Sequence, residues 1–427
     1  MKSCLPYTLL LLGLLSNSNV FAEQCRDRRK WPFSISSIWN TPIGSDANYM
    51  AANLYIGNDC DAGTDLNERV LCPGWNRSIT PIQCVDVLDC CYEPTPDPNP
   101  ENIPWCFKTK TSPGQIHADQ DYFVTASGTD PLTPWYDQGS WDGSDHCELK
   151  NDSIFVRSIH VPNNFLCPNK YGPENNAVGI LMPDNITLLE TQPVYRCSPG
   201  APFLSRTNAS CCPNGYPQYQ SILGDGALGA HGGSGLSATG GMIRVGELLN
   251  TTGQIRHALK LEFFAHQYYY GGHQLQPHTE TNGGRTQYVW PAIGSDAYTW
   301  NTGSRLAYNG TNPYLVPGAL LAIPPTLANK VQTTTVPGAK IKDALLQFGG
   351  YIVDDTASDS AAICCEGDAS IEFEQVYGER FSTNSGPWYD DLLTIFRALH
   401  IVVNNGPHAI GGGGHPSTYL APPICDE

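Results

Sequence analysis

The chain has 427 residues, of which 15% are charged, and it contains 42 glycines and 34 prolines. This composition is typical of a mainly β protein with long ordered loops and argues against a helical bundle. The formal net charge of −17 argues against nucleic acid as a partner, because phosphate binding needs clustered lysine and arginine, and it disfavours a polyanionic substrate.

Residues 1–22 have the features of a secretory signal peptide. Lys2 supplies a positive charge, a short apolar run spans residues 9–15, and residues 20–22 offer small side chains at the positions that signal peptidase requires. The apolar run is far shorter than the roughly 20 residues of a transmembrane helix. We therefore expect a secreted, extracellular protein with no membrane span, whose mature chain begins at Glu23.

The first half of the mature chain shows short β signals between loops. Residues 31–41 mix aromatic and β-branched side chains, as an early strand or an ordered arm would. Residues 60–106 form a cysteine-rich insertion with little apolar material of its own. Apolar runs at 154–156 and 177–181, and a turn followed by a return strand at 182–189, predict further strands.

The second half begins with residues 224–241, where eight glycines predict a tight irregular loop whose backbone passes close to other groups. Residues 257–264 predict an amphipathic strand, with Leu259, Leu261 and Phe263 on one face. Residues 288–290 predict its partner strand.

Two short helices are predicted near the C-terminus, from apolar stripes at 341–348 and 392–399, and residues 351–353 predict a strand between them. The sum is a mainly β fold, a β-sandwich of jelly-roll-like form with two peripheral helices. We expect one β-rich domain over residues 23–427, carrying residues 60–106 as an insertion.

Fifteen cysteines follow the signal segment, and an oxidising compartment favours disulfides. Adjacent cysteines stand at 90–91, 211–212 and 364–365. Since neighbouring cysteines rarely bond each other, we expect each half to bond a different strand or loop. The odd total predicts a free thiol or an intermolecular disulfide.

Asn-x-Ser/Thr sequons predict N-glycosylated surface loops. They lie at Asn76, Asn151, Asn185, Asn208, Asn250 and Asn309.

Several segments together resemble a largely uncharacterised family of secreted proteins of bacteria and microbial eukaryotes. They are IWNTPI at 38–43, SGL at 234–236, IRVGEL at 243–248, IRHAL at 255–259, YVWPA at 288–292 and ALLQFGGYIVDD at 344–355. The resemblance covers about half of the chain. The cysteine-rich insertion departs from the pattern of the bacterial members. It implies export and a shared fold, and it implies no reaction.

Two carboxylates that face each other are the usual machinery of a glycosidase. The candidate catalytic residues are Asp225, Glu247, Glu262, His231 and His257, with Asp296 and Glu374 as further carboxylates. The sequence does not show which pair converges. For His257 a hydrogen-bonded core position is the alternative, since it shares a strand face with Leu259.

Other chemistries find less support. The glycine-rich segment lacks the G-x-S-x-G pattern of a serine hydrolase. Gln115, His117, Asp119 and Tyr122 resemble cleft residues of jelly-roll polysaccharide lyases, but no arginine-rich strand accompanies them. The histidines and acids between residues 257 and 285 match no metal motif, and no CxxC pair indicates zinc, so we expect no metal and no cofactor.

Aromatic side chains flanked by polar residues can stack on sugar rings, although core packing is the alternative. The candidates for substrate binding are Trp135, Tyr136, Tyr288 and Trp300. We therefore expect a carbohydrate-active protein that acts on or binds an extracellular polysaccharide or glycan, as a hydrolase rather than a lyase if it is an enzyme. The alternative is a non-enzymatic structural glycoprotein of a matrix or cell coat, for which an odd cysteine offers an intermolecular disulfide.

Overall fold

The computed structural model describes residues 25–54, 56, 69–71, 105–107, 115–138, 145–168, 175–206, 218–249, 254–272, 287–296, 299, 306–356 and 358–425. The signal segment and nearly all of the cysteine-rich insertion lie outside these residues. None of the helices described has the length and apolar character that a membrane crossing needs.

Short strands dominate the chain. They are β1 (Tyr49–Ala51), β2 (Arg69–Leu71), β3 (Trp105–Phe107), β4 (Gln115–Thr125), β5 (Leu132–Asp137), β6 (Ile154–His160), β7 (Val178–Leu181), β8 (Thr187–Thr191), β9 (Val194–Tyr195), β10 (Phe203–Ser205), β11 (Gln218–Ser221), β12 (Leu228–His231), β13 (Leu259–Phe263), β14 (Leu320–Ala322), β15 (Gly350–Asp355), β16 (Ser360–Glu366) and β17 (His400–Val402). The helices are α1 (Ala265–Tyr268), α2 (Val336–Gln347), α3 (Gly367–Tyr377) and α4 (Pro387–Arg397), with short 3₁₀ turns η2 (Pro325–Leu327) and η3 (Ile410–Gly412).

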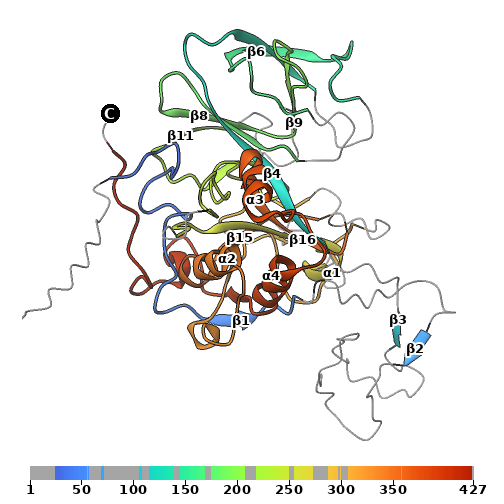
Figure 1. The fold of residues 1–427 in the computed structure, drawn as a ribbon, viewed down its shortest axis with the longest axis vertical. Helices are drawn as coiled ribbons and strands as arrows, with labels where there is room; N and C mark the ends of the chain where they lie inside the picture. The colour runs from blue at the N-terminus through green and yellow to red at the C-terminus, as the bar shows by residue number, and fades with distance from the viewer. Residues whose placement is uncertain are drawn as a thin grey trace, which may run out of the picture.

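A mixed ten-stranded sheet forms the centre of the molecule, in the order β1-β17-β14-β15-β13-β16-β4-β7-β8-β11. The pairs β13–β15, β16–β4 and β4–β7 are parallel, and the remaining neighbours are antiparallel. A second sheet, in the order β6-β5-β10-β9, lies at the top of Figure 1. Strands β2 and β3 form a separate pair.

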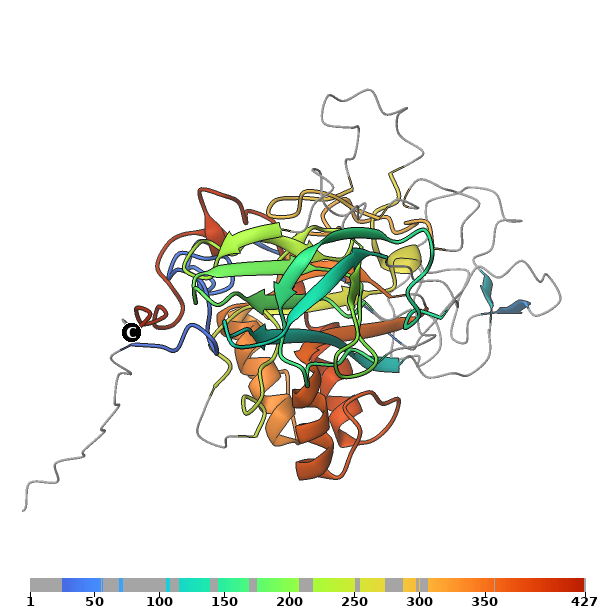
Figure 2. The ribbon, with the colours of Figure 1, turned by 90° about the horizontal axis from the view of Figure 1, so that it is seen from above.

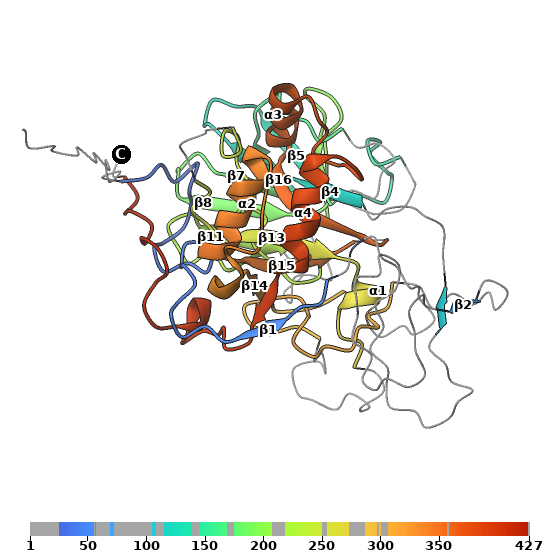
Figure 3. The same cartoon turned by 60° about the horizontal axis from the view of Figure 1, so that its bottom comes forward.

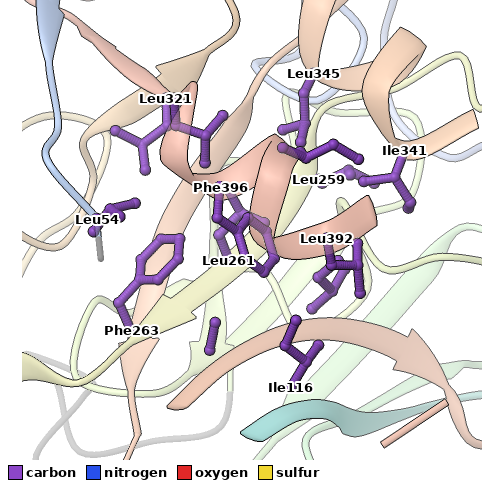
Figure 4. Packing of buried hydrophobic residues seen from close by; sticks show 14 of the residues in the cluster. Leu54, Ile116, Leu259, Leu261, Phe263, Leu321, Ile341, Leu345, Leu392 and Phe396 are labelled. Carbon is purple, nitrogen blue, oxygen red and sulfur yellow. The ribbon is translucent and has the colours of Figure 1, made fainter. Parts of the chain in front are cut away.

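Three apolar clusters hold these layers together. One joins Val124 and Ile180 of the large sheet to Trp135 and Phe203 of the small sheet, which gives the sandwich-like packing. A larger cluster lies on the helical side of the large sheet, where Phe263 meets Phe396 edge to face at 5.6 Å (Figure 4). The mainly β fold predicted from composition and strand patterns is confirmed.

Helices α2 and α4 cover one face of the central strands, as Figure 3 shows from their side. Helix α2 begins where the Thr335 hydroxyl accepts a hydrogen bond from Gly338 N at 3.0 Å, and Pro337 occupies the first turn. The Asp391 carboxylate of α4 accepts from the backbone N–H groups of Thr334 and Thr335, both at 2.8 Å. This contact ties the two helices together at their N-termini.

Both predicted helices are present as α2 and α4, and the predicted strands near 154, 178, 187 and 351 are present as β6, β7, β8 and β15. Helix α3 was not predicted, because its hydrophobic residues are split between buried Phe373 and exposed Ile371 and Val376. Residues 31–41 form an ordered arm of turns rather than a strand, with Trp39 buried against the glycine-rich segment.

The predicted partnership of residues 288–290 with the strand at 257–264 is wrong. Val289 lies in a loop and donates its N–H to Pro317 O at 2.9 Å. Strand β13 instead lies between β15 and β16, and all five of its residues are buried. It is therefore a central strand covered on both faces, and not an amphipathic strand with a solvated side.

Two disulfides are present among the described residues, Cys25–Cys425 and Cys147–Cys197. Cys25–Cys425 joins the start and the end of the described chain, across a separation of 400 residues. The expectation that Cys364 and Cys365 each bond a different loop is wrong. Both are free and buried, because β16 is an inner strand whose alternate side chains point into the two covered faces.

Replacing the Phe396 ring of the helical cluster tests this packing. Phe396→Ala should lower the free energy of unfolding by about 3–5 kcal/mol, because the ring is fully buried against Phe263. Val376→Ala is the matched control, since that side chain is 56% exposed and its loss should change stability by less than about 0.5 kcal/mol. Urea denaturation measures both, and equal effects would contradict the packing described here.

Candidate functional site

The face of the large sheet that turns away from α2 and α4 carries ionisable side chains on four neighbouring strands. They are Asp119 and Asp121 on β4, Lys260 and Glu262 on β13, Asp354 on β15 and Cys364 on β16. Each is at most 8% exposed. The placement follows from strand alternation, since Leu259, Leu261 and Phe263 point to the helical face and the residues between them point the other way.

Strand pairing brings these side chains into one layer. Cys364 lies opposite Asp119 in the parallel β16–β4 pair. A register shift in the β13–β15 pair places Asp354 opposite Glu262. In Figure 2, the view from above, the orange and red helices lie together on one side of the strands.

The glycine-rich segment covers the layer. A Cβ atom on Gly232 would lie 2.2 Å from Asp354 Cγ, and one on Gly233 would lie 2.7 Å from Asp296 Cγ, so only glycine fits at either position. The loop is anchored by buried Glu190 of β8, whose carboxylate accepts from the Ser237 hydroxyl at 2.7 Å and from Thr239 N at 2.9 Å. The close backbone approach predicted for residues 224–241 is confirmed.

Lys260 supplies a buried positive charge to the layer. Its Nζ donates to Asp121 Oδ2, to Ala238 O at 2.7 Å and to Ser237 O at 3.4 Å. Burial lowers the pKa of Lys260, but the charge and hydrogen bond of Asp121, together with other acidic groups such as Glu190, outweigh burial and raise the pKa overall. Lys260 is therefore ionised and also fastens the covering loop to the sheet.

His231, at the end of β12, points its Nε2 atom into the carboxylates. Nε2 lies 3.2 Å from Asp121 Oδ1, 3.4 Å from Asp119 Oδ2 and 3.9 Å from Glu262 Oε1. Burial and Lys260 lower the pKa of His231, but Asp121 and Asp119 outweigh them and raise it to about 9.

The acidic groups around His231 have different proton affinities. Burial raises the pKa of Asp119, but the hydrogen bond and charge of His231, together with hydrogen bonds from Glu262 and Asn175, outweigh it and hold that pKa below its usual value. Burial, together with the charges of Asp119 and Asp354, raises the pKa of Glu262 well above its usual value. Burial and the charge of Glu262 likewise raise the pKa of the Cys364 thiol, whose Sγ lies 3.4 Å from Glu262 Oε1.

A second group of carboxylates adjoins the first. Carboxylate oxygens of Asp296, Asp354 and Asp355 lie within 4.8 Å of one another. Burial and the Asp296 charge raise the pKa of Asp354 to about 7. Asp296 is partly exposed and accepts a hydrogen bond from the Tyr308 hydroxyl at 2.6 Å. The Asn175 amide links the groups, donating to Asp354 Oδ2 at 3.1 Å and to Asp119 Oδ2 at 3.3 Å.

Among the predicted catalytic residues, the structure brings together Glu262 and His231 in this layer and places Asp296 beside it. Glu247 and His257 form an ion pair of their own, at 3.1 Å, and His257 Nδ1 contacts Ala258 O at 2.9 Å. The buried, hydrogen-bonded position considered for His257 is the one observed. Asp225, the remaining candidate, is exposed on the surface.

Sequence reasoning missed the contributions of Asp121, Lys260, Asp354 and Cys364. A signal was present for Lys260, because it alternates with the apolar residues of the 257–264 strand, but that face was taken to be solvated. Asp354 ends an otherwise apolar strand, and polar residues at the end of a buried strand indicate a site. Nothing in the local sequence separates Cys364 from Cys365.

The predicted sugar-binding aromatics have different surroundings. Trp135 is fully buried, packs edge to face on Phe203 at 5.9 Å and donates Nε1–H to Ser205 Oγ at 2.7 Å, so its ring belongs to the core. Tyr136 is half-buried against Phe155, and Tyr288 is half-buried in its loop. Trp300 lies outside the described residues.

The predicted glycosylation sites fall into two groups. Asn151 and Asn309 are exposed, and Asn185 is half-buried in a turn. Asn76, Asn208 and Asn250 lie outside the described residues.

The buried charge pair yields a stability prediction. Lys260→Met should lower the free energy of unfolding by about 3–5 kcal/mol, because it removes one of the two cations that face the buried Asp121 carboxylate and leaves only His231. Adding Asp121→Asn should recover much of this loss. Lys330→Met on the exposed surface serves as the control, and thermal or urea denaturation measures all three. A Lys260→Met variant as stable as the control would contradict the role assigned to this pair.

Comparison with known proteins places one segment of the chain. Residues 60–109 match the Trefoil (P-type) domain, and this match covers the cysteine-rich insertion. No curated protein and no solved structure matches the chain. The trefoil match and the disulfides are both features of extracellular proteins.

Proposed function

We propose that the protein is a secreted carbohydrate-active hydrolase that cleaves a glycosidic bond in an extracellular polysaccharide. The proposal rests on one observation, the adjacent carboxyl groups of Asp354 and Asp296 at the edge of the buried polar layer. Asp354 is the proton donor and Asp296 is the second carboxylate, which attacks or stabilises the anomeric carbon. Two such carboxyl groups are the minimum that this chemistry requires.

The surroundings of the two groups suit different roles. A pKa of about 7 keeps a large fraction of Asp354 protonated near neutral pH, so it can donate to the leaving oxygen. Asp296 is more exposed and holds a hydrogen bond from Tyr308, which favours a carboxylate that acts on the sugar ring. One oxygen of each group lies within 4.8 Å of one oxygen of the other, and the proposal assigns a retaining mechanism on this closeness, since inverting enzymes place the two carboxyl groups about 6.5–9.5 Å apart.

The charge around the pair supports a neutral polysaccharide as substrate. Asp119 and Asp355 add further acidic groups close by, and they would repel a uronate or a nucleic-acid phosphate. Ile293 N donates to Ser234 O at 2.9 Å, which lays the loop of Tyr288 along the glycine-rich segment. In the proposal, the half-buried Tyr288 ring supplies a stacking surface for a sugar.

Export, N-glycosylation and membership of the secreted family that the second half of the chain resembles are parts of the same proposal. The competing proposal is a non-enzymatic structural glycoprotein cross-linked through an odd cysteine. Within the described part of the chain, the free thiols of Cys167, Cys364 and Cys365 are all buried, which disfavours cross-linking through any of these three.

Isosteric variants test the carboxyl pair. On a panel of neutral polysaccharides, the wild-type protein should release new reducing ends, and Asp354→Asn should lower kcat by about 10²–10⁴-fold, because it removes the proton donor. Asp296→Asn should reduce kcat similarly. Asp368→Asn, on the exposed first turn of α3, is the control. An Asp354→Asn enzyme as active as this control would overturn the assignment, and absence of any product would favour the structural glycoprotein.

The pH dependence follows from the required protonated state of Asp354. Above a pH of about 7 the acid loses its proton, so kcat/KM should fall about tenfold per pH unit. A pH–rate profile on the responsive polysaccharide measures this. An NMR record of the first product anomer should show retained configuration, and an inverted product would contradict the assigned roles.

A further inference from the structure

A group of mixed ligand atoms lies beside the proposed catalytic pair. Oxygens of Asp119 and Glu262, a ring nitrogen of His231 and Sγ of Cys364 all lie within 4.8 Å of one another. They come from β4, β13, β12 and β16, and the four side chains are between 0% and 8% exposed. We propose that these four residues bind a single divalent transition-metal ion, for which zinc is the best match.

The acidic groups around His231 have too few hydrogen-bond donors. His231 Nε2 carries at most one proton, yet it faces Asp121 Oδ1 at 3.2 Å, Asp119 Oδ2 at 3.4 Å and Cys364 Sγ at 3.5 Å. The Cys364 thiol has one further proton, for which Glu262 and Asp119 compete. Lys260 donates to Asp121 and to two backbone carbonyls, so it donates no hydrogen bond to Asp119 or Glu262.

An atom inside the cluster also lacks a partner. Within the described residues, the buried Nδ1 of His231 forms no hydrogen bond. A buried polar atom without a partner costs about 1–3 kcal/mol. A dipositive ion among the four ligands would hold the imidazole through Nε2 and offset the charge of the nearby carboxylates.

The four ligand atoms are of the types that bind zinc. One imidazole nitrogen, one sulfur and two carboxylate oxygens form a four-ligand set of the kind that zinc accepts, whereas calcium and magnesium prefer oxygen alone. Binding replaces the proton of the Cys364 thiol, and any proton on Glu262 or on His231 Nε2, and releases them to solvent. The sulfur–metal bond forms with no change of oxidation state.

Cys364 forms no disulfide. The chain forms disulfides elsewhere, yet this thiol remains free and directs its sulfur at His231 and Glu262. Its neighbour Cys365 packs among apolar side chains of the helical face. One cysteine of the adjacent pair therefore has the surroundings of a ligand, and the other has the surroundings of a core residue.

The test uses the full secreted chain, stripped with a chelator and titrated with Zn²⁺ and with Co²⁺. We expect one tightly bound ion per chain and, with Co²⁺, a thiolate-to-metal charge-transfer absorption. Cys364→Ser should abolish this absorption and weaken Zn²⁺ binding by more than the roughly 10–100-fold effect of an outer partner. Cys365→Ser is the matched control, because it changes the adjacent residue on the opposite face of β16 and should bind as the wild type does.

Glu262→Gln is a second variant of nearly unchanged size, and near-ultraviolet circular dichroism checks the folding of each. Failure of the folded wild type to bind either ion would overturn the proposal, as would a charge-transfer absorption that is equal in Cys364→Ser and Cys365→Ser. Asp354→Asn separates this inference from the proposed hydrolysis, since that variant should lose activity and still bind the ion.

Discussion

The burial of charge on one face of the central sheet is the constraint on which the rest of the structure depends. Lys260 and Asp121 meet in a fully buried ion pair, and removal of either partner would leave a buried charge without its closest counter-charge. The two residues lie on β13 and β4, which are separated in the sheet by β16 alone. The pair therefore fixes the relative position of three inner strands and of every ionisable side chain that they carry.

The glycine-rich segment is a consequence of that constraint. A buried charged layer needs hydrogen-bond partners that bring no bulk, and backbone groups are the smallest ones available. Lys260 accordingly donates to the carbonyls of Ser237 and Ala238, while Glu190 accepts from N–H groups of the same loop. Glycines at 232 and 233 let the chain pass within contact of Asp354 and Asp296. The loop covers the charged layer and forms hydrogen bonds to its charged groups. In the proposed function it also forms a wall of the site.

The two faces of the large sheet have different roles, one forming the apolar core and the other the polar layer. On the helical face, α2 and α4 exclude water and provide the rigidity that holds each strand. On the opposite face, the same strands align carboxyl groups whose pKa values are displaced in opposite directions, as Asp119 and Glu262 are. Such displacement is typical of functional sites. Residues 60–109, which match the Trefoil (P-type) domain, precede β4 in the chain.

The sequence by itself determined the mainly β class, the helices α2 and α4, the strands β6, β7, β8, β13 and β15, and the close approach of the glycine-rich loop. These follow from local patterns of apolar residues, proline and glycine, which act over a few neighbours along the chain. Only the tertiary structure decided that Lys260 and Glu262 face a buried layer, that Cys364 stays unpaired, and that Asp354 meets Asp296. Each of these depends on which strands become neighbours and on a one-residue register shift between β13 and β15. Local alternation shows that two side chains share a face, but burial of that face depends on contacts between segments more than 100 residues apart in the chain.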